Sequence, residues 1–293
     1  MIAFASNSLL CRAALKQTNI DPSSFTFIRI FFGAVALCLL MYVRRRATVS
    51  RTAPSFLESS SLAFAARRSS FRNGYWTSAV MLFVYAAGFS FAYTSVSAGT
   101  GALLLFGAVQ ATMILWGLLK GERFNAVQIV GLLAAVIGLV ILVFPGLSAP
   151  PLFGSILMLG AGVAWGFYSL RGKGERNPAG VTAGNFVRAV PFASALCIIF
   201  APWIHLNLAG ISYAIISGAV TSGLGYVIWY SALPGLKSAS AATVQLSVPV
   251  LAATGGILLL GEPITLRYIL ASVTVLGGIA LVVTTPHSLD QNE

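Results

Sequence analysis

The sequence predicts an all-α integral membrane protein with ten transmembrane helices, arranged as two inverted five-helix repeats. Its 293 residues are 57% hydrophobic and 9% charged, which is more apolar surface than one soluble core can bury. The second observation is a duplication. The segment 27–40, FIRIFFGAVALCLL, returns without a gap at 186–199 as FVRAVPFASALCII, with six of fourteen residues identical. The chain therefore reads as two related halves in a lipid bilayer.

A second pair of matching segments defines the length of each half. Gly121-Glu122, late in the first half, is matched by Gly261-Glu262 in the second. We therefore expect a first repeat at residues 1–145, a second repeat at 152–284 and a polar tail at 285–293.

The first predicted helix is short. Its apolar run, 2–10, cannot cross about 30 Å of hydrocarbon, which needs roughly 20 residues. The matching run in the second half spans 152–170, and aligning Phe4 with Trp165 leaves about ten fewer residues before the aromatic in the first copy. This alignment predicts that the N-terminal residues were lost through a late start codon or truncation, and that the first helix is shorter than its counterpart by about ten residues.

The other predicted helices are apolar runs between helix-start and helix-stop residues. Asp21-Pro22 marks the start of the second helix, and Pro145-Gly146 marks the end of the fifth. A polar loop at 44–73 interrupts the first half, and its segment 56–66 fits either a short interfacial helix or disorder. The predicted ranges are 23–43, 76–96, 101–119, 126–144, 152–170, 182–202, 211–233, 238–260 and 266–283.

The basic residues indicate the orientation. An odd number of helices per half makes the two halves enter the membrane in opposite directions, so the repeats are inverted. Alternate loops put thirteen Lys and Arg residues on one side, against Lys16 and Arg267 on the other. The positive-inside rule assigns the basic side to the cytoplasm, with both termini there. This topology accounts for the net charge of +11 without nucleic-acid binding.

The ionisable residues do not favour catalysis. All acidic residues and both histidines fall in predicted loops or tails, so no catalytic constellation lies within a span. The three cysteines, Cys11, Cys38 and Cys197, lack disulfide or metal-ligand spacing and are expected to be small core residues. We expect no enzymatic activity, no metal and no cofactor.

Aromatic residues recur at helical spacing on several predicted helices, near isolated polar side chains. Such stripes often belong to the core or to the aromatic belts at the membrane surface. Amides within a span, however, need partners or water, so one shared wet cavity accounts for both groups. The candidate substrate-binding residues are Asn7, Tyr85, Phe89, Gln110, Trp165, Tyr168, Tyr226, Trp229 and Gln245.

Four charged residues are candidates for gating or charge recognition. Arg29 and Arg188 lie early in the second and seventh predicted helices, where a charge is costly. Each is either a gate or anion contact, or a snorkelling side chain that binds loop carbonyls. Glu122 and Glu262 follow Gly at opposite faces of the membrane. Each either caps a loop or pairs with Arg123 or Arg267, or has a gating or proton-linked role.

Several of these motifs resemble one family. They are Trp165-Gly-Phe-Tyr168 with Phe4-Ala-Ser-Asn7 in the first copy, the Phe-x-Arg of both halves, and the two Gly-Glu pairs. Together they resemble the EamA family of the drug/metabolite transporter superfamily, and within it the YddG-type amino-acid exporters, over nearly the whole chain. The resemblance implies a ten-helix basket in the bacterial inner membrane, with a central substrate cavity reached by alternating access. The chain departs from the pattern in its short first helix and at Val109, where the second copy has Pro249.

The sequence thus predicts a secondary transporter that exports small metabolites, foremost neutral and aromatic or hydrophobic amino acids. The alternatives are a carrier of drugs or lipophilic cations and, from another class, a non-transporting membrane scaffold. Inverted repeats favour transport, because they build a site at the bilayer midplane that opens alternately to each side. The expected partners are a small-molecule substrate and membrane lipid, without nucleic acid, and the expected state is a monomer.

Overall fold

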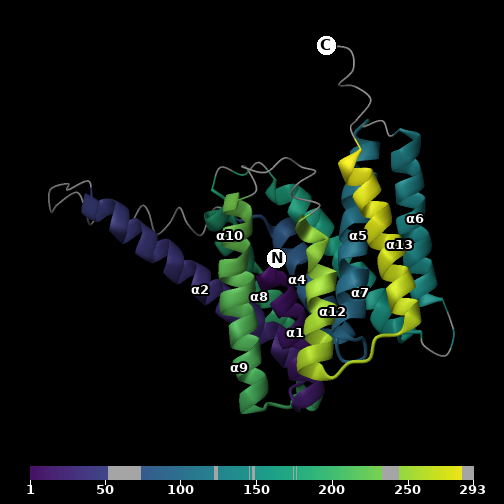
Figure 1. Ribbon diagram of the computed structural model, residues 1–293. Coiled ribbons are helices and arrows are strands. Elements are labelled where there is room, and N and C mark those ends of the chain that lie inside the picture. Colours follow the sequence, from purple (N-terminus) through teal and green to yellow (C-terminus); the bar gives the residue numbers. More distant parts are fainter. Residues whose placement is uncertain are drawn as a thin grey trace, which may run out of the picture.

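The computed structural model describes residues 1–51, 74–121, 125–144, 146, 149–173, 175, 177–232 and 244–285, and these form helices joined by turns (Figure 1). The helices of the first half are α1 (Ile2–Gln17), α2 (Pro22–Arg51), α4 (Trp76–Ala92), α5 (Ala98–Leu119) and α6 (Ala126–Val143). Those of the second are α7 (Leu152–Gly172), α8 (Pro178–Ile199), α9 (Leu208–Ile216), α10 (Gly225–Ala232), α12 (Ser247–Leu260) and α13 (Leu266–Thr284), with a 3₁₀ turn, η1 (Ala201–Trp203). The predicted interfacial helix at 56–66, Glu122 and the tail after residue 285 lie outside the described residues.

A π-helix, η2 (Ser217–Leu224), joins α9 to α10, so that the three elements form one span of 25 residues, Leu208–Ala232. With this span counted once, the described helices follow the predicted order. Seven of the described helices are long and apolar enough to cross a membrane. The protein is therefore a multi-pass membrane protein, while the full count of ten spans stays a prediction.

The predicted helix boundaries were most clearly wrong at α1, α2 and α8. Helix α2 continues to Arg51, so the first residues of the predicted polar loop at 44–73 are helical. Helix α1 has 16 residues and α7 has 21, so the difference is five residues and not about ten. The first helix continues to Gln17 because Arg12 and Lys16 in its last turns bond to neighbouring elements. Helix α8 begins at Pro178, where the Asn177 side chain caps the amide of Gly180, and not at Thr182. Arg188 thus lies ten residues into its helix, about 15 Å of rise from its start.

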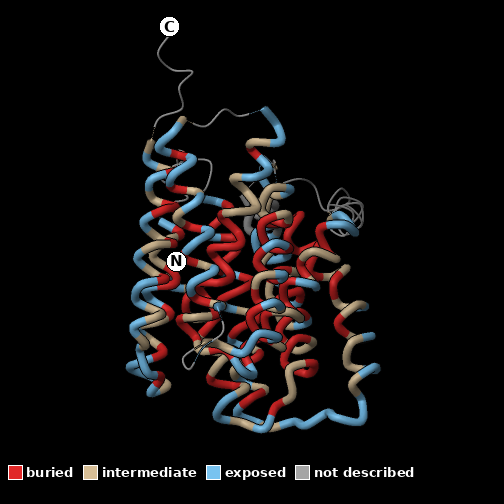
Figure 2. Tube along the Cα trace, turned by 90° about the vertical axis from the view of Figure 1, so that its right-hand side faces the viewer, coloured by how far each residue is buried: buried red, intermediate tan, exposed pale blue. Residues whose placement is uncertain are grey.

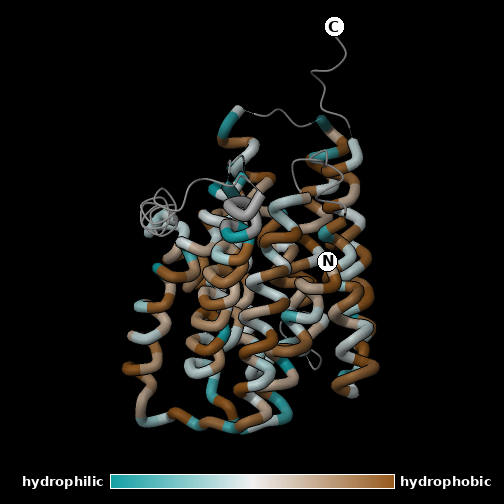
Figure 3. Tube along the Cα trace, turned by 90° about the vertical axis from the view of Figure 1, so that its left-hand side faces the viewer, coloured by the Kyte–Doolittle hydropathy of each residue, from teal (hydrophilic) through white to brown (hydrophobic). Residues whose placement is uncertain are grey.

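The outer surface of the bundle is apolar. Buried residues gather in the interior (Figure 2), while hydrophobic residues continue along the outward faces of the helices (Figure 3). Helices α6 and α13 pack against each other along their lengths at one edge of the bundle (Figure 1). The outward face of α6 exposes Val130, Leu133, Ile137 and Val140, each more than half accessible. Such a surface is stable in lipid and costly in water.

The helices pair in a pattern that involves both halves. Helix α2 packs on α8, α5 on α12 and α6 on α13. Helix α4 packs on α7, and α1 packs on α9 and η2. Helices α5 and α12 are each followed within two residues by a glycine with positive φ, Gly121 at 94° and Gly261 at 61°, a conformation that residues with a Cβ rarely adopt.

Asp21 fixes the turn between α1 and α2. Its carboxylate accepts hydrogen bonds from the amides of Ser23 and Ser24, at 3.0 and 2.9 Å, and from the hydroxyl of Ser23. It also accepts the amide of His205 at 3.1 Å, which ties this turn to the α8–α9 connection. Partial burial raises the pKa of Asp21, but the hydrogen bonds outweigh it and the pKa lies below its ordinary value.

Candidate functional site

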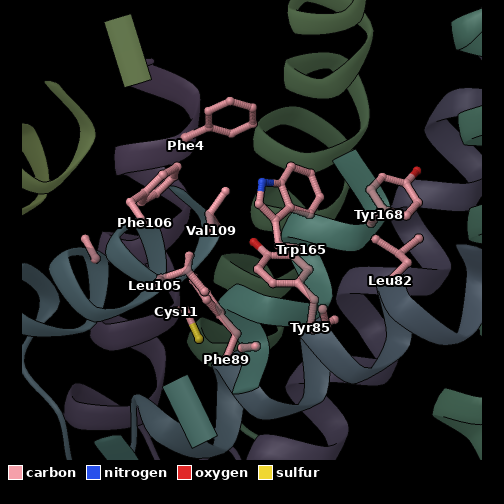
Figure 4. Close-up of a cluster of buried hydrophobic side chains, with 14 of the residues drawn as sticks. Phe4, Cys11, Leu82, Tyr85, Phe89, Leu105, Phe106, Val109, Trp165 and Tyr168 are labelled. Atoms are coloured by element: carbon pink, nitrogen blue, oxygen red, sulfur yellow. The ribbon is translucent and has the colours of Figure 1, made fainter. Parts of the chain in front are cut away.

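Seven aromatic side chains from four helices, α1, α4, α7 and α10, meet in the middle of the bundle, and we call them the ring cluster. Trp165 lies at its centre, with ring centroids 4.8 Å from Tyr85, 4.8 Å from Tyr226 and 5.3 Å from Tyr168. Figure 4 shows Trp165 between Tyr85, Tyr168 and Phe4. The members are Phe4, Tyr85, Phe89, Trp165, Tyr168, Tyr226 and Trp229, none more than 8% exposed. All six aromatic residues predicted for the substrate site belong to this cluster.

The centre of the cluster is filled by the rings themselves. Phe4 contacts both Trp165 and Trp229, at centroid distances of 6.2 and 6.0 Å. Phe4 was expected only as the counterpart of Trp165, yet it connects the predicted rings of α7 and α10. The rings therefore contact one another in this structure, in place of lining the open wet cavity that was expected.

A chain of buried polar side chains runs along one side of the rings, and we call it the polar chain. Asn7 Nδ2 donates to the Tyr85 hydroxyl at 3.3 Å, and Arg29 Nη2 donates to the same hydroxyl at 2.9 Å. Asn7 Oδ1 accepts hydrogen bonds from Ser217 at 2.6 Å and Thr221 at 3.2 Å. The far end of the chain is Ser222, whose Oγ accepts from Arg29 Nε at 3.2 Å. The polar chain thus joins α1, α2 and α4 of the first half to η2 of the second.

The π-helix η2 supplies three members of the polar chain, Ser217, Thr221 and Ser222, which the sequence analysis missed. A π-helix widens the turn and often occurs at functional sites. Gly218, in the same segment, packs so closely on the backbone of Arg29 that a Cβ there would overlap it. The sequence does contain a signal for this polar site, because residues 217–224, SGAVTSGL, are rich in serine, threonine and glycine within an otherwise apolar span.

Arg29 is the most polar group in this region, and its side chain is 2% exposed. Its guanidinium carbon lies 4.8 Å from the ring centroid of Phe89 and 5.1 Å from that of Tyr85. Among the described residues, no carboxylate lies within 4 Å of the Arg29 guanidinium. The salt bridge in this part of the chain joins Arg12 to Glu262. The Nη1 atom of Arg29 and the hydroxyl of Tyr226 are both buried, and neither has a hydrogen-bond partner among the described residues.

The equivalent arginine of the second half has a different environment. Arg188 is half-buried, and its Nη1 donates to the carbonyl of Gly184 at 3.1 Å. Its guanidinium carbon lies 5.9 Å from the ring of Trp76, at the start of α4. The duplicated Phe-x-Arg therefore gives one arginine inside the polar chain and one beside the first residue of α4.

Two predicted amides form a separate pair. Gln110 of α5 donates to Gln245, just before α12, at 3.5 Å, and both side chains are buried. Phe106, one turn before Gln110, contacts Phe4 at 6.5 Å between ring centroids. The pair therefore lies behind the ring cluster, and its hydrogen bond joins equivalent helices of the two halves.

Glu262 pairs with a residue that the sequence analysis overlooked. Arg12 Nε donates to Glu262 Oε1 at 2.8 Å, and the amide of Ala98 donates to Oε2 at 2.8 Å. Arg12 also donates to the carbonyls of Tyr93 and Thr94, at 2.8 and 3.2 Å. The expected pairing with Arg267 was wrong, because Arg267 bonds to the carbonyl of Phe144. One ion pair thus connects α1, the α4–α5 turn and the α12–α13 turn.

Two cavities lie at opposite ends of α4 and α7, with Tyr85 and Trp165 between them. The larger, of about 210 Å³, is lined by Ser95, Ser97, Thr100, Pro151, Glu262, Thr265 and Tyr268. The smaller holds about 10 Å³ and is lined by Tyr75, Ser78, Tyr168, Arg171, Asn185 and Tyr230. The larger cavity therefore lies beside the ion pair and not within the ring cluster.

Comparisons with known proteins identify the family. The pattern of the EamA-like transporter family matches residues 152–284. An uncharacterized protein of Pseudomonas aeruginosa is 53% identical over 96% of this chain and 91% of its own length. An uncharacterized transporter of Archaeoglobus fulgidus is 24% identical over 98% of this chain and 96% of its own length. The threonine/homoserine exporter RhtA of Escherichia coli is 35% identical over half of each chain, 50% in both cases.

A solved crystal structure has the same overall fold. It covers 100% of this chain and 98% of its own chain with a TM-score of 0.59, at 15% sequence identity. The full-length relatives, the matched family pattern and the multi-pass helical bundle agree with one another. The chain belongs to the EamA-like transporter family.

Proposed function

We propose that this protein is a secondary transporter of the bacterial inner membrane that exports small metabolites, foremost neutral and aromatic or hydrophobic amino acids, by alternating access. One observation carries the proposal. Buried hydroxyl, amide and guanidinium groups from both halves form one hydrogen-bonded chain beside seven aromatic rings. Polar and ionisable groups inside a membrane span are costly, and they usually mark a substrate or ion pathway.

The packing of the two halves supports inverted repeats. Equivalent helices contact each other in the pairs α2 with α8, α5 with α12 and α6 with α13. The contact of α4 with α7 has its counterpart in the contact of η2 with α1. In transporters built this way, substrate binds near the midplane between the repeats, and one repeat rocks against the other.

The two cavities support alternating access. One lies beside Glu262 at one end of α4 and α7, and the other reaches Tyr168 at the opposite end. The rings of Tyr85 and Trp165, 4.8 Å apart, separate them. Movement of these rings would connect the site to one cavity at a time, which is the requirement for a carrier.

The chemistry of the site supports amino acids as substrates. Ring faces attract apolar side chains and ammonium groups, while hydroxyl and amide groups bond the polar backbone of an amino acid. The relative RhtA is named as an exporter of the amino acids threonine and homoserine. The predominance of rings in this site favours larger, aromatic or hydrophobic side chains. The buried charge of Arg29 disfavours the alternative, a carrier of lipophilic cations.

The topology belongs to the same proposal. The positive-inside rule puts both termini and the loop 44–73 in the cytoplasm, which leaves the Arg12–Glu262 ion pair on the periplasmic side. Substrate would then enter from the smaller cavity and leave past the ion pair.

Reconstitution tests the proposal. The purified full chain is inserted into liposomes, and uptake of L-phenylalanine, L-leucine, L-threonine and tetraphenylphosphonium is measured against protein-free liposomes. We expect saturable transport of L-phenylalanine or L-leucine, weaker transport of L-threonine and none of the cation. A matched control is Trp116→Ala, which removes an indole from the outward face of α5, where Trp116 is 39% exposed. Protein-free rates for all amino acids would contradict transport and favour a scaffold.

A further inference from the structure

We infer that Arg29 and Tyr226 bind a single carboxylate group of the transported molecule, so that a free carboxylate is a requirement for binding. This inference rests on the proposed transport function and adds the charge that a substrate must have. It starts from Arg29, the one fully buried cationic side chain in the described helices. No carboxylate of the described residues lies within 4 Å of Arg29.

The guanidinium is held in a fixed position. Nε donates to Ser222 at 3.2 Å, Nη2 donates to Tyr85 at 2.9 Å, and the rings of Phe89 and Tyr85 lie at about cation–π distance, 4.8 and 5.1 Å. These contacts are all neutral. They orient the group, but they leave its positive charge uncompensated inside an apolar bundle, where an unpaired charge costs several times more than a lost neutral hydrogen bond.

Two donors remain for a ligand. Arg29 Nη1 is buried without a partner among the described residues, and so is the hydroxyl of Tyr226. Both side chains lie beside the same rings: Arg29 donates to the Tyr85 hydroxyl, and the rings of Tyr85 and Tyr226 each lie 4.8 Å from that of Trp165. A carboxylate has two oxygens, so it can accept one bond from each donor and supply the missing negative charge.

The same groups limit which anions fit. The site offers one cation and two free donors, whereas a phosphate monoester or a dicarboxylate carries more negative charge and more acceptor atoms than these groups satisfy. The surrounding rings of Phe4, Trp165 and Tyr226 suit an apolar or aromatic body. The expected ligand is therefore an amphipathic monocarboxylate, which an amino acid is and a lipophilic amine is not.

The duplicated arginine supports a specific role for Arg29. Arg188 stands at the equivalent position, yet it is half-buried and bonds to the carbonyl of Gly184 on its own helix. If the arginine of each repeat served only to stabilise the fold, both arginines would be expected to have the same environment. Instead, Arg29 is fully buried among the rings, and its Nη1 atom has no hydrogen-bond partner among the described residues.

Direct binding tests the inference without relying on transport. The purified full chain in nanodiscs is titrated by isothermal calorimetry with L-phenylalanine, L-phenylalaninamide and 3-phenylpropionate. L-Phenylalaninamide keeps the ring and amine but replaces the carboxylate, and 3-phenylpropionate keeps the ring and carboxylate but lacks the amine. We expect L-phenylalanine to bind and its amide to bind at least about tenfold more weakly, because the buried guanidinium is then left unpaired. We expect measurable binding of 3-phenylpropionate.

Variants assign the effect to the two side chains. Arg29→Gln is expected to weaken L-phenylalanine binding at least about tenfold and to abolish the preference over the amide. Arg29→Lys keeps the charge and should keep part of the preference. Tyr226→Phe should lower affinity severalfold. Arg46→Gln, the same substitution at an exposed position of α2, should bind like wild type, and chromatographic and thermal profiles check that each variant is folded.

The outcomes separate this inference from the proposed function. Transport of amino acids together with equal binding of acid and amide overturns the carboxylate site and leaves the transport function standing. Acid-selective binding that depends on Arg29, without transport in liposomes, supports the site and contradicts the function. Absence of saturable binding for both carboxylate probes, or full acid preference in Arg29→Gln, overturns the inference.

Discussion

Arg12 Nε donates to Glu262 Oε1 at 2.8 Å, and this contact connects the last turns of α1 to the turn between α12 and α13. The side chains are only 12% and 6% exposed. Glu262 also accepts the amide of Ala98, the first residue of α5. On the proposed topology this ion pair closes the periplasmic end of the site, and its separation is a requirement for release of substrate.

Glu262→Gln tests this ion pair as a structural lock. The substitution keeps the shape of the side chain but leaves the guanidinium of Arg12 without its counter-charge, so we expect a loss of about 3 kcal/mol in the free energy of unfolding. The double variant Arg12→Gln/Glu262→Gln should lose less than the sum of the single variants, as measured by chemical unfolding in detergent micelles. Additive losses would mean that the two side chains do not interact in the folded protein.

Gly218→Ala tests the close approach of η2 and α2. A methyl group at residue 218 would overlap the backbone of Arg29, so we expect a loss of about 1 to 3 kcal/mol and weaker substrate binding. The matched control is Gly160→Ala on α7, where nothing lies within 4 Å of the added methyl group. That control should be neutral or stabilising by up to about 1 kcal/mol. Equal thermal stability of the two variants would contradict the packing described for Gly218.

Asp21→Asn tests the charge at the start of α2 through its pH dependence. Because the folded-state pKa of Asp21 is lowered, its charge stabilises the fold above the unfolded pKa, and this contribution disappears as the pH falls through the folded value. Asparagine is a comparable N-cap, so the variant should be less stable than wild type at pH 7, with a difference that shrinks in acid. Thermal unfolding from pH 7 to 3 measures it. A difference that is constant with pH would show that the charge is not involved.

Trp165→Ala and Tyr226→Ala test the ring cluster. In the proposed function several rings share the recognition of substrate, at about 0.5 to 1.5 kcal/mol per aromatic pair, so each variant should lower transport of L-phenylalanine severalfold without abolishing it. Because truncation of a buried ring also destabilises the fold, rates are compared for correctly inserted, folded protein, with Trp116→Ala as the control. Unchanged transport in both variants would mean that these rings are core packing and that the site lies elsewhere.

Much of the fold follows from the sequence, because apolar length and periodicity are local properties. The described helices follow the predicted order, with most bounds within a few residues of the predicted ones, and the rings predicted from helical spacing on separate segments do meet around Trp165. The difference in length between α1 and α7 was overestimated because the alignment of Phe4 with Trp165 compared only the residues before each aromatic. After the aromatic, α1 is the longer of the two and continues to Gln17, and Arg12 in this part is paired with a residue 250 positions away.

Other parts of the site depend on contacts that no local pattern contains. The π-helical register of 217–224 changes backbone hydrogen bonding without changing the apolar pattern, so the contribution of Ser217 and Thr221 to the polar chain was not apparent. The duplication also suggested equal roles for Arg29 and Arg188. Their environments differ because each packs against different neighbours, Tyr85 and Ser222 in one case and Gly184 and Trp76 in the other.

Alternate exposure of the polar chain is the central claim, and side-specific labelling of one residue tests it most directly. Thr221, which is 5% exposed, is replaced by cysteine in a background without Cys11, Cys38 and Cys197, and reconstituted protein is treated with a membrane-impermeant thiol reagent from each side separately. We predict labelling from both sides of the membrane, slowed by L-phenylalanine. Labelling from one side only, or no labelling from either side in transport-active protein, would contradict alternating access at this site.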